Sequence, residues 1–149
     1  MNYVIEEFGI KRIAYMRRVG PYGPENYQIM QKLKQWATKK DIFSGCTIYG
    51  IAQDGPNIPP EKCRYDVCLV IDDEKVLDSE VIDGYLPIGK YAVFTIIHTA
   101  EAVQYFWQEV TKIVKENNLH CDLSKPILER YQESLVRDGK CEFCIPLIK

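Results

Sequence analysis

Residues 125–133 read Lys-Pro-Ile-Leu-Glu-Arg-Tyr-Gln-Glu, and the interpretation of the whole chain is organised around this stretch. A proline followed by Ile127 to Gln132 predicts a short strand, whose side chains alternate between two faces. Glu129 then shares a face with Ile127 and Tyr131, where apolar side chains are expected. Because glutamate is rarely buried without a partner, either this face is wet and Glu129 is an ordinary surface charge, or the face lines a pocket.

The composition is that of one globular domain. The chain has 149 residues, of which 46% are hydrophobic and 27% charged, enough to bury a core. A net charge of −2 and a pI near 5.7 provide no basic patch, so direct nucleic-acid binding is not expected. The N-terminus lacks the pattern of a signal peptide and no apolar run could span a membrane, so we expect a cytoplasmic protein without membrane association.

Six cysteines raise the question of disulfides or a metal site. A reducing cytoplasm argues against stable disulfides. Cys141 and Cys144 have CxxC spacing, but no second ligand pair accompanies them, and residues three apart on a strand face opposite ways. We therefore expect no metal site and no cofactor, with the cysteines serving as small core residues.

The rest of the chain alternates between strand and helix patterns. Period-two runs predict strands, and apolar residues at three- and four-residue steps predict helices. The expected elements are a strand at 11–19, a helix from Pro24 to Lys40 with an apolar stripe from Tyr27 to Ala37, strands at 46–52 and 64–71, a charged connector at 72–86 with a short edge strand around Val81 and Ile82, a strand at 90–97, a helix N-capped by Thr99 and ending near Asn118, and strands at 127–132 and 141–148.

The order of these elements indicates a duplication. Residues 12–14 overlay 90–92 at an offset of 78, and residues 66–69 overlay 142–145 at an offset of 76. We expect an α+β fold of two βαββ halves, about 1–72 and 86–149, forming an antiparallel sheet with both helices on one side. Ligand sites favour junctions between structural units, so a groove is expected between the halves. An offset of 80 sets Tyr49 against Glu129 there.

Several motifs stand in a fixed order along the chain: Val-Gly-Pro-Tyr-Gly-Pro at 19–24 before a helix, Ile-Tyr-Gly at 48–50 leading to Asp-Gly-Pro at 54–56, residues 60–68, Gly-Lys-Tyr-Ala-Val-Phe at 89–94, Trp107, and Glu-Arg-Tyr at 129–131. Together they resemble the GyrI-like small-molecule-binding family, which supplies effector-binding domains to MerR-type and AraC-type regulators. The resemblance covers nearly the whole chain and implies one domain over 1–149, a duplicated βαββ unit and a cleft with an acidic residue at its base. No DNA-binding segment precedes Met1, so we expect a stand-alone member.

The resemblance matches the cleft acid to Glu129 and implies binding of small amphipathic, aromatic or cationic molecules, for drug sensing or sequestration. A carboxylate among aromatic rings attracts lipophilic cations. The expected ligand contacts are Glu129, Tyr131, Trp107, Tyr91 and Tyr49.

Two alternatives stay open. Some GyrI-like proteins hydrolyse cyclopropane-containing DNA-alkylating compounds, which would make Glu129 a general base and Tyr131 a hydrogen-bond donor to the developing oxyanion. The second alternative is an interaction protein that modulates a topoisomerase, with DNA gyrase or a separate regulator as partner. His98 and His120 are interpreted as solvated surface residues.

Overall fold

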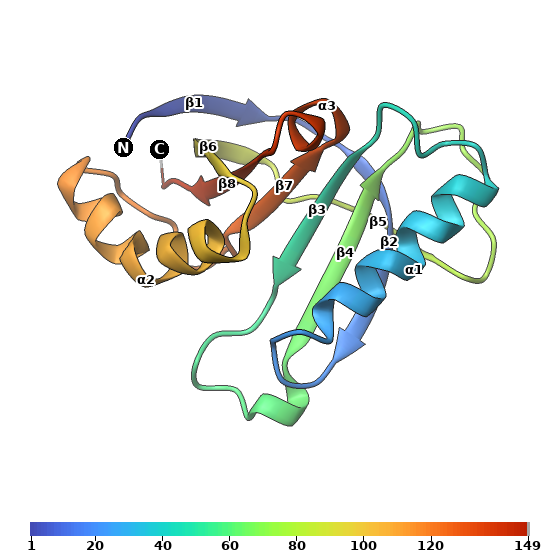
Figure 1. Ribbon diagram of the computed structural model, residues 1–149, viewed down its shortest axis with the longest axis horizontal. Coiled ribbons are helices and arrows are strands. Elements are labelled where there is room, and N and C mark those ends of the chain that lie inside the picture. Colours follow the sequence, from blue (N-terminus) through green and yellow to red (C-terminus); the bar gives the residue numbers. More distant parts are fainter. Residues whose placement is uncertain (149) are drawn as a thin grey trace.

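The computed structural model describes residues 1–148 (Figure 1). Its elements are β1 (Tyr3–Phe8), β2 (Arg12–Val19), α1 (Asn26–Lys39), β3 (Thr47–Ala52), the 3-10 turn η1 (Pro60–Lys62), β4 (Arg64–Val70), β5 (Ile82–Tyr85), β6 (Gly89–Ile97), α2 (Ala100–Glu116), β7 (Leu128–Gln132), the short helix α3 (Glu133–Arg137) and β8 (Lys140–Pro146). The predicted elements are all present. The strand β1 and the helix α3 were not predicted.

One antiparallel sheet of 8 strands, in the order β1-β6-β8-β7-β3-β4-β2-β5, organises the molecule. This order is symmetric about the β7–β3 pair when each strand of one half is exchanged for its counterpart, which confirms the α+β fold of two related halves. The edge strands are exchanged between halves, because β1 precedes β2 but pairs with β6, and β5 precedes β6 but pairs with β2. The approximate twofold axis that relates the two halves therefore lies where they meet, between β3 and β7.

Both long helices cover the same face of the sheet (Figure 1). In α1 the buried side chains are Met30, Leu33, Trp36 and Ala37, as the stripe predicted, whereas Tyr27 is 67% exposed. Tyr27 lies in the first turn, beside a hollow rather than over a strand. The helix α2 begins where predicted, since the Thr99 hydroxyl accepts a hydrogen bond from the Ala102 N–H at 3.1 Å, a standard N-cap.

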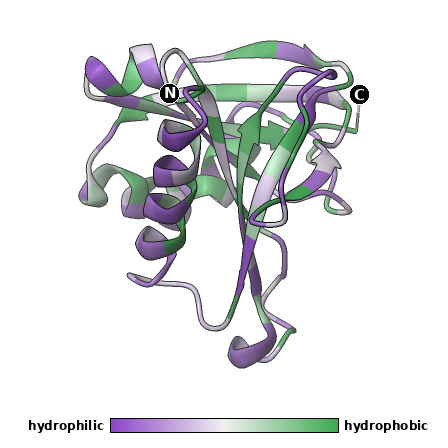
Figure 2. Ribbon diagram, turned by 90° about the vertical axis from the view of Figure 1, so that its right-hand side faces the viewer, coloured by the Kyte–Doolittle hydropathy of each residue, from purple (hydrophilic) through white to green (hydrophobic). Residues whose placement is uncertain are grey.

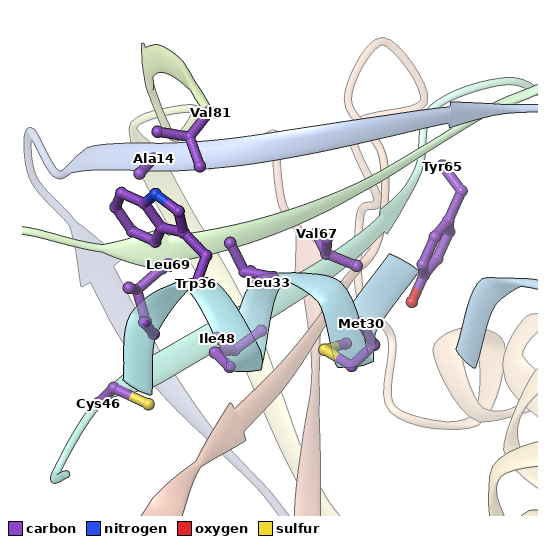
Figure 3. Packing of buried hydrophobic residues seen from close by; sticks show 11 residues of the cluster. Ala14, Met30, Leu33, Trp36, Cys46, Ile48, Tyr65, Val67, Leu69 and Val81 are labelled. Atoms are coloured by element: carbon purple, nitrogen blue, oxygen red, sulfur yellow. The ribbon is translucent and has the colours of Figure 1, made fainter. Parts of the chain in front are cut away.

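Two clusters of buried side chains lie under the helices. The α1 cluster runs from Trp36 to Tyr65, which lie at opposite ends of it in Figure 3. The α2 cluster is built on Phe94, Phe106 and Phe143. Half-buried Tyr131 packs against both clusters and so marks the junction of the halves.

The opposite face of the sheet carries a third group, the far-face cluster, which includes Phe8, Tyr49, Tyr91, Leu128 and Cys144. Figure 2 shows the hydrophobic residues concentrated along the strands that separate these layers, with hydrophilic residues on the outer turns of the helices.

Within the described residues, five of the six cysteines are buried core residues, as predicted, and Cys121 is half-buried. Cys141 belongs to the α2 cluster and Cys144 to the far-face cluster, so the CxxC pair points to opposite sides of β8. All six thiols are free. Residues 1–148 contain no group of three or more Cys, His, Asp or Glu side chains placed to hold a metal ion. None of the helices described over residues 1–148 is both long and apolar enough to cross a membrane.

Candidate functional site

Glu129 lies in the middle of β7, at the junction of the two halves, on the face that carries the helices. Neutral donors hold its carboxylate. The Tyr65 hydroxyl donates to Oε1 at 2.9 Å, the Tyr131 hydroxyl donates to the same oxygen at 3.3 Å, and the Trp107 indole N–H donates to Oε2 at 3.3 Å. These donors come from β4, β7 and α2, so the site is assembled from both halves of the chain.

The hydrogen bond from Tyr65 to Glu129 depends on the absence of a side chain at Gly50. In the sheet register, Gly50 of β3 is paired with Glu129 on one side and Val67 on the other, and Tyr65 pairs with Ala52. The Tyr65 phenol therefore crosses diagonally over Gly50 to reach the carboxylate. A Cβ atom at Gly50 would contact the Tyr65 hydroxyl and lie 2.6 Å from Glu129 Oε1. A glycine within a strand often marks such a close approach.

No described Lys, Arg or His pairs with the Glu129 carboxylate. The buried carboxylates on the opposite face differ, because Asp66 is held by Arg17 at 2.7 Å and Glu142 by Arg130 at 2.9 Å. Burial raises the pKa of Glu129, and the hydrogen bond from Tyr65 only partly opposes that effect. The site therefore holds an anion that has donors but no counter-ion.

The tyrosine donors remain neutral at physiological pH. Burial and the neighbouring Glu129 charge raise the pKa of Tyr65 and of Tyr131 above the usual value for tyrosine. Both phenols therefore keep their protons and point them at the carboxylate.

Two hollows open beside the residues of this site, and Glu129 lines one of them. The Glu129 hollow has a volume of about 410 Å³ and is lined by Tyr22, Asn26, Ala52, Asp54, Tyr65, Trp107, Ile127 and Glu129. The α1–α3 hollow has a volume of about 490 Å³ and is lined by Asn26, Tyr27, Met30, Lys34, Phe43, Cys46, Ile48, Tyr65, His98, Tyr131, Glu133, Val136 and Arg137. Both volumes are typical of ligand pockets. Asn26 and Tyr65 line both hollows, so the two are neighbours, and they are referred to together as the two-part cleft.

The rim of the Glu129 hollow is held in place by its own polar contacts. The Tyr22 hydroxyl donates to the Arg64 carbonyl oxygen at 2.9 Å and accepts from the Asp54 N–H at 2.9 Å. The Asp54 carboxylate in turn accepts hydrogen bonds from the Arg64 guanidinium at 2.8 and 3.0 Å. This second carboxylate is therefore already paired, which leaves Glu129 as the unpaired charge of the hollow.

Three of the five predicted site residues meet in this cleft, namely Glu129, Tyr131 and Trp107. Trp107 is 37% exposed, with its ring edge-on to Phe143 at 5.3 Å, so it forms a wall of the hollow rather than part of the core. Their roles as ligand contacts stay predictions.

The structure does not bring Tyr49 and Tyr91 to the cleft, which corrects their expected placement. Tyr49 is 1% and Tyr91 0% exposed, both in the far-face cluster. Tyr49 pairs with Arg130, whereas Gly50 pairs with Glu129, and a one-residue difference in register moves a side chain to the other face of a sheet. Burial raises the pKa of each of these tyrosines to about 12.

Sequence reasoning missed Tyr65, Gly50 and Asn26 as site residues. Gly50 carried the available signal, since glycine interrupts an otherwise β-branched and aromatic strand. His98 and His120 are exposed, as predicted. His98 also lines the α1–α3 hollow, with its ring 5.4 Å from that of Tyr131.

A two-part apolar cleft across the junction of a duplicated α+β sheet is typical of a small-molecule-binding domain. Residues 1–148 match the family described as the GyrI-like small molecule binding domain, and the chain belongs to that family.

Relatives and solved structures agree with this assignment. The chain is 40% identical over 149 residues, 99% of each protein, to YosT of Bacillus subtilis (strain 168), which is named as a candidate transcriptional regulator derived from the SPbeta prophage. It is 29% identical over 100 residues, 64% of each protein, to a DNA gyrase inhibitor of Serratia proteamaculans (strain 568). Its fold is similar to that of SAV2435 bound to tetraphenylphosphonium, with a TM-score of 0.66, 17% identity and coverage of 99% of this chain and 94% of the other.

Proposed function

We propose that this GyrI-like domain binds small lipophilic cations with aromatic groups, and that Glu129 is the counter-ion. The observation that carries the proposal is the unpaired Glu129 carboxylate, held only by neutral donors at the base of the hollow. Two opposite charges 4 Å apart attract by about 4 kcal/mol at an effective dielectric constant of about 20. A cation that enters the hollow gains this attraction and lowers the pKa of Glu129 again.

The aromatic walls suit the same ligand class. Trp107, Tyr65 and Tyr22 line the Glu129 hollow, and a cation over such rings gains about 0.5–2 kcal/mol. The similar structure of SAV2435 holds tetraphenylphosphonium, an aromatic cation of this kind. Sequestration or sensing of such compounds in the cytoplasm is the role we propose for the chain.

The test is binding of tetraphenylphosphonium, measured by isothermal titration calorimetry, with triphenylphosphine oxide as an uncharged probe of similar shape. We expect the cation to bind more tightly than the neutral probe, and Glu129→Gln to weaken cation binding about tenfold to hundredfold, since each factor of ten is about 1.4 kcal/mol. The control is Glu7→Gln, an exposed carboxylate of β1 that lines neither hollow. Equal affinity of wild type and Glu129→Gln for the cation would reject the proposal.

Hydrolysis of cyclopropanoid compounds is a second candidate, favoured by the raised pKa of Glu129, which suits a general base. Glu129 would take a proton from the water that attacks the strained ring, and Tyr131 would donate a hydrogen bond to the oxygen that gains charge as the ring opens. Mass spectrometry of such a compound incubated with wild type and Glu129→Gln separates the candidates. Turnover that the substitution abolishes supports hydrolysis, whereas binding without turnover in wild type excludes it.

An interaction with a topoisomerase is the third candidate, supported by the name of the Serratia relative as a DNA gyrase inhibitor. A gyrase supercoiling assay with added wild-type protein tests it directly. Inhibition that Glu129→Gln leaves unchanged would place this activity on a surface away from the cleft, and absence of inhibition would leave small-molecule binding as the function.

A further inference from the structure

The α1–α3 hollow differs in charge from the Glu129 hollow. Lys34 of α1 lines it, is half-buried, and forms no ion pair with any described residue. Glu133, the carboxylate of this hollow, is already engaged, because it accepts a hydrogen bond from the Gly45 N–H at 2.6 Å and pairs with Arg137 at 3.1 Å. The charge that remains available in this hollow is therefore positive, where that of the Glu129 hollow is negative.

A second nitrogen donor stands near Lys34. Partial desolvation in the hollow and the Lys34 charge lower the pKa of His98, which favours the neutral imidazole with one ring N–H to donate. The His98 ring contacts Tyr131, whose hydroxyl donates to Glu129. Tyr131 thus lies between the negative and the positive end of the cleft.

The space near Lys34 is apolar. Met30, Phe43, Ile48 and Val136 provide its walls, and such walls favour a hydrocarbon or aromatic body by about 25 cal/mol for each Å² removed from water. The half-buried Lys34 ammonium has no carboxylate partner among the described residues, so its N–H donors are available to a bound anion at the edge of this apolar space.

We propose that the α1–α3 hollow is an anion subsite of the same cleft, and that the preferred ligands are amphipathic zwitterions. The cationic end contacts Glu129, the apolar body lies over Tyr65 and Met30, and a carboxylate or phosphate accepts hydrogen bonds from Lys34 and His98. This inference rests on the proposed binding of cations at Glu129 and adds the second charge that the ligand carries.

Lys34 is assigned this role in preference to Arg137. The Arg137 side chain is 71% exposed and is already paired with Glu133, and a solvent-exposed pair of this kind contributes little to binding. Lys34 is better shielded from solvent and its ammonium group is free to move towards a ligand.

Rhodamine B and its methyl ester form a matched pair of fluorescent probes. They share one cationic aromatic body, but rhodamine B carries a free carboxylate at neutral pH and the ester does not. Fluorescence anisotropy titrations would measure both affinities. We expect wild type to bind rhodamine B about fivefold to tenfold more tightly than the ester, the effect of one partly screened ion pair in an apolar site.

Lys34→Met should remove this preference by lowering the affinity for rhodamine B relative to that for the ester, while Lys34→Arg should retain the preference. Lys32→Met, on the exposed side of the same helix, is the matched control and should behave as wild type. Equal affinities of the two probes for wild type, or an equal loss of both in Lys34→Met, would overturn the anion subsite.

The two proposals fail differently. If neither probe binds, or if Glu129→Gln leaves the affinity for the ester unchanged, cation binding at Glu129 is refuted, and the anion subsite with it. If the ester binds through Glu129 and the carboxylate adds nothing, only the anion subsite is refuted.

Discussion

Replacing Gly50 by alanine tests the geometry of the candidate site without changing a charged or polar group. The added Cβ would contact the Tyr65 hydroxyl and lie 2.6 Å from Glu129 Oε1, closer than such atoms approach in real structures. Gly50 has no positive φ, so the strand backbone itself accepts alanine. The methyl group must therefore displace either the phenol or the carboxylate, and the 2.9 Å hydrogen bond between them is lost.

The size of the effect follows from these contacts. A hydrogen bond to a charged group contributes about 1.5–3 kcal/mol, and one extra methyl group in a packed site destabilises by about 1–3 kcal/mol. Gly→Ala also stabilises by about 0.4–1 kcal/mol through the unfolded chain. We therefore expect a net loss of about 1.5–5 kcal/mol, which lowers Tm by roughly 3–20 °C for a chain of this size.

Binding should respond as well, because Glu129 loses the shortest of its hydrogen bonds and its carboxylate is no longer fixed in place. We expect the affinity for tetraphenylphosphonium to fall about tenfold, the equivalent of about 1.4 kcal/mol. Calorimetric titration and differential scanning calorimetry give the two readouts. The control is Gly9→Ala, where an added Cβ meets nothing within 4 Å. A Gly50→Ala protein with the Tm and affinity of Gly9→Ala would refute this account of the site.

Other predictions concern charge. Because the pKa of Glu129 is raised, cation affinity should decline as pH falls through that pKa, approaching tenfold per pH unit below it, and affinities that stay constant from neutral pH down to pH about 4 would contradict this. A raised carboxyl pKa contributes stability that is fully present below the pKa of the unfolded chain, about 4.3, and is lost as the pH rises through the pKa of the folded protein, by about 1.4 kcal/mol for each pH unit between the two pKa values. Glutamine does not titrate, so the Tm of Glu129→Gln should rise relative to that of wild type as the pH increases. A Tm difference that is independent of pH would refute the pKa shift. Arg130, whose side chain is 6% exposed, pairs with Glu142 and Glu6, so Arg130→Met should lower stability by about 3–5 kcal/mol, whereas Lys112→Met, in an exposed pair, should change it by less than about 1 kcal/mol in denaturant titrations.

Local patterns predicted most of the fold because each long element buries one regular stripe. The strand β1 escaped prediction because Val4 and Ile5 are both exposed and only Phe8 is fully buried, so its pattern does not alternate. It is a strand because it pairs with β6 of the other half. The helix α3 has only five residues, too few to be stable without tertiary contacts.

Only the part of the candidate site that lies on the single strand β7 could be predicted from the alternation of the sequence. Alternation along β7 placed Glu129 and Tyr131 on one face correctly. Tyr65 reaches the carboxylate through the register of three neighbouring strands, and register is a tertiary property. Tyr49 was misplaced because the offset of 80 between the repeats is out of register, and a slip of one residue moves a side chain to the other face of the sheet.

The duplication places β7, and with it Glu129, at the junction of the halves, but the proposed cation site depends on a difference between the halves. At the junction of the halves, β3 and β7 pair directly, so whatever one half places there adjoins the other. A second carboxylate opposite Glu129 would force at least one of the two to hold a proton, because adjacent like charges raise carboxyl pKa values. The first half instead supplies Gly50, which carries no charge and leaves room for the Tyr65 phenol. A single counter-ion beside an aromatic donor therefore requires the two halves to differ at the Gly50–Glu129 pair. Because the site is not symmetric, a ligand bound there has a defined orientation within the cleft.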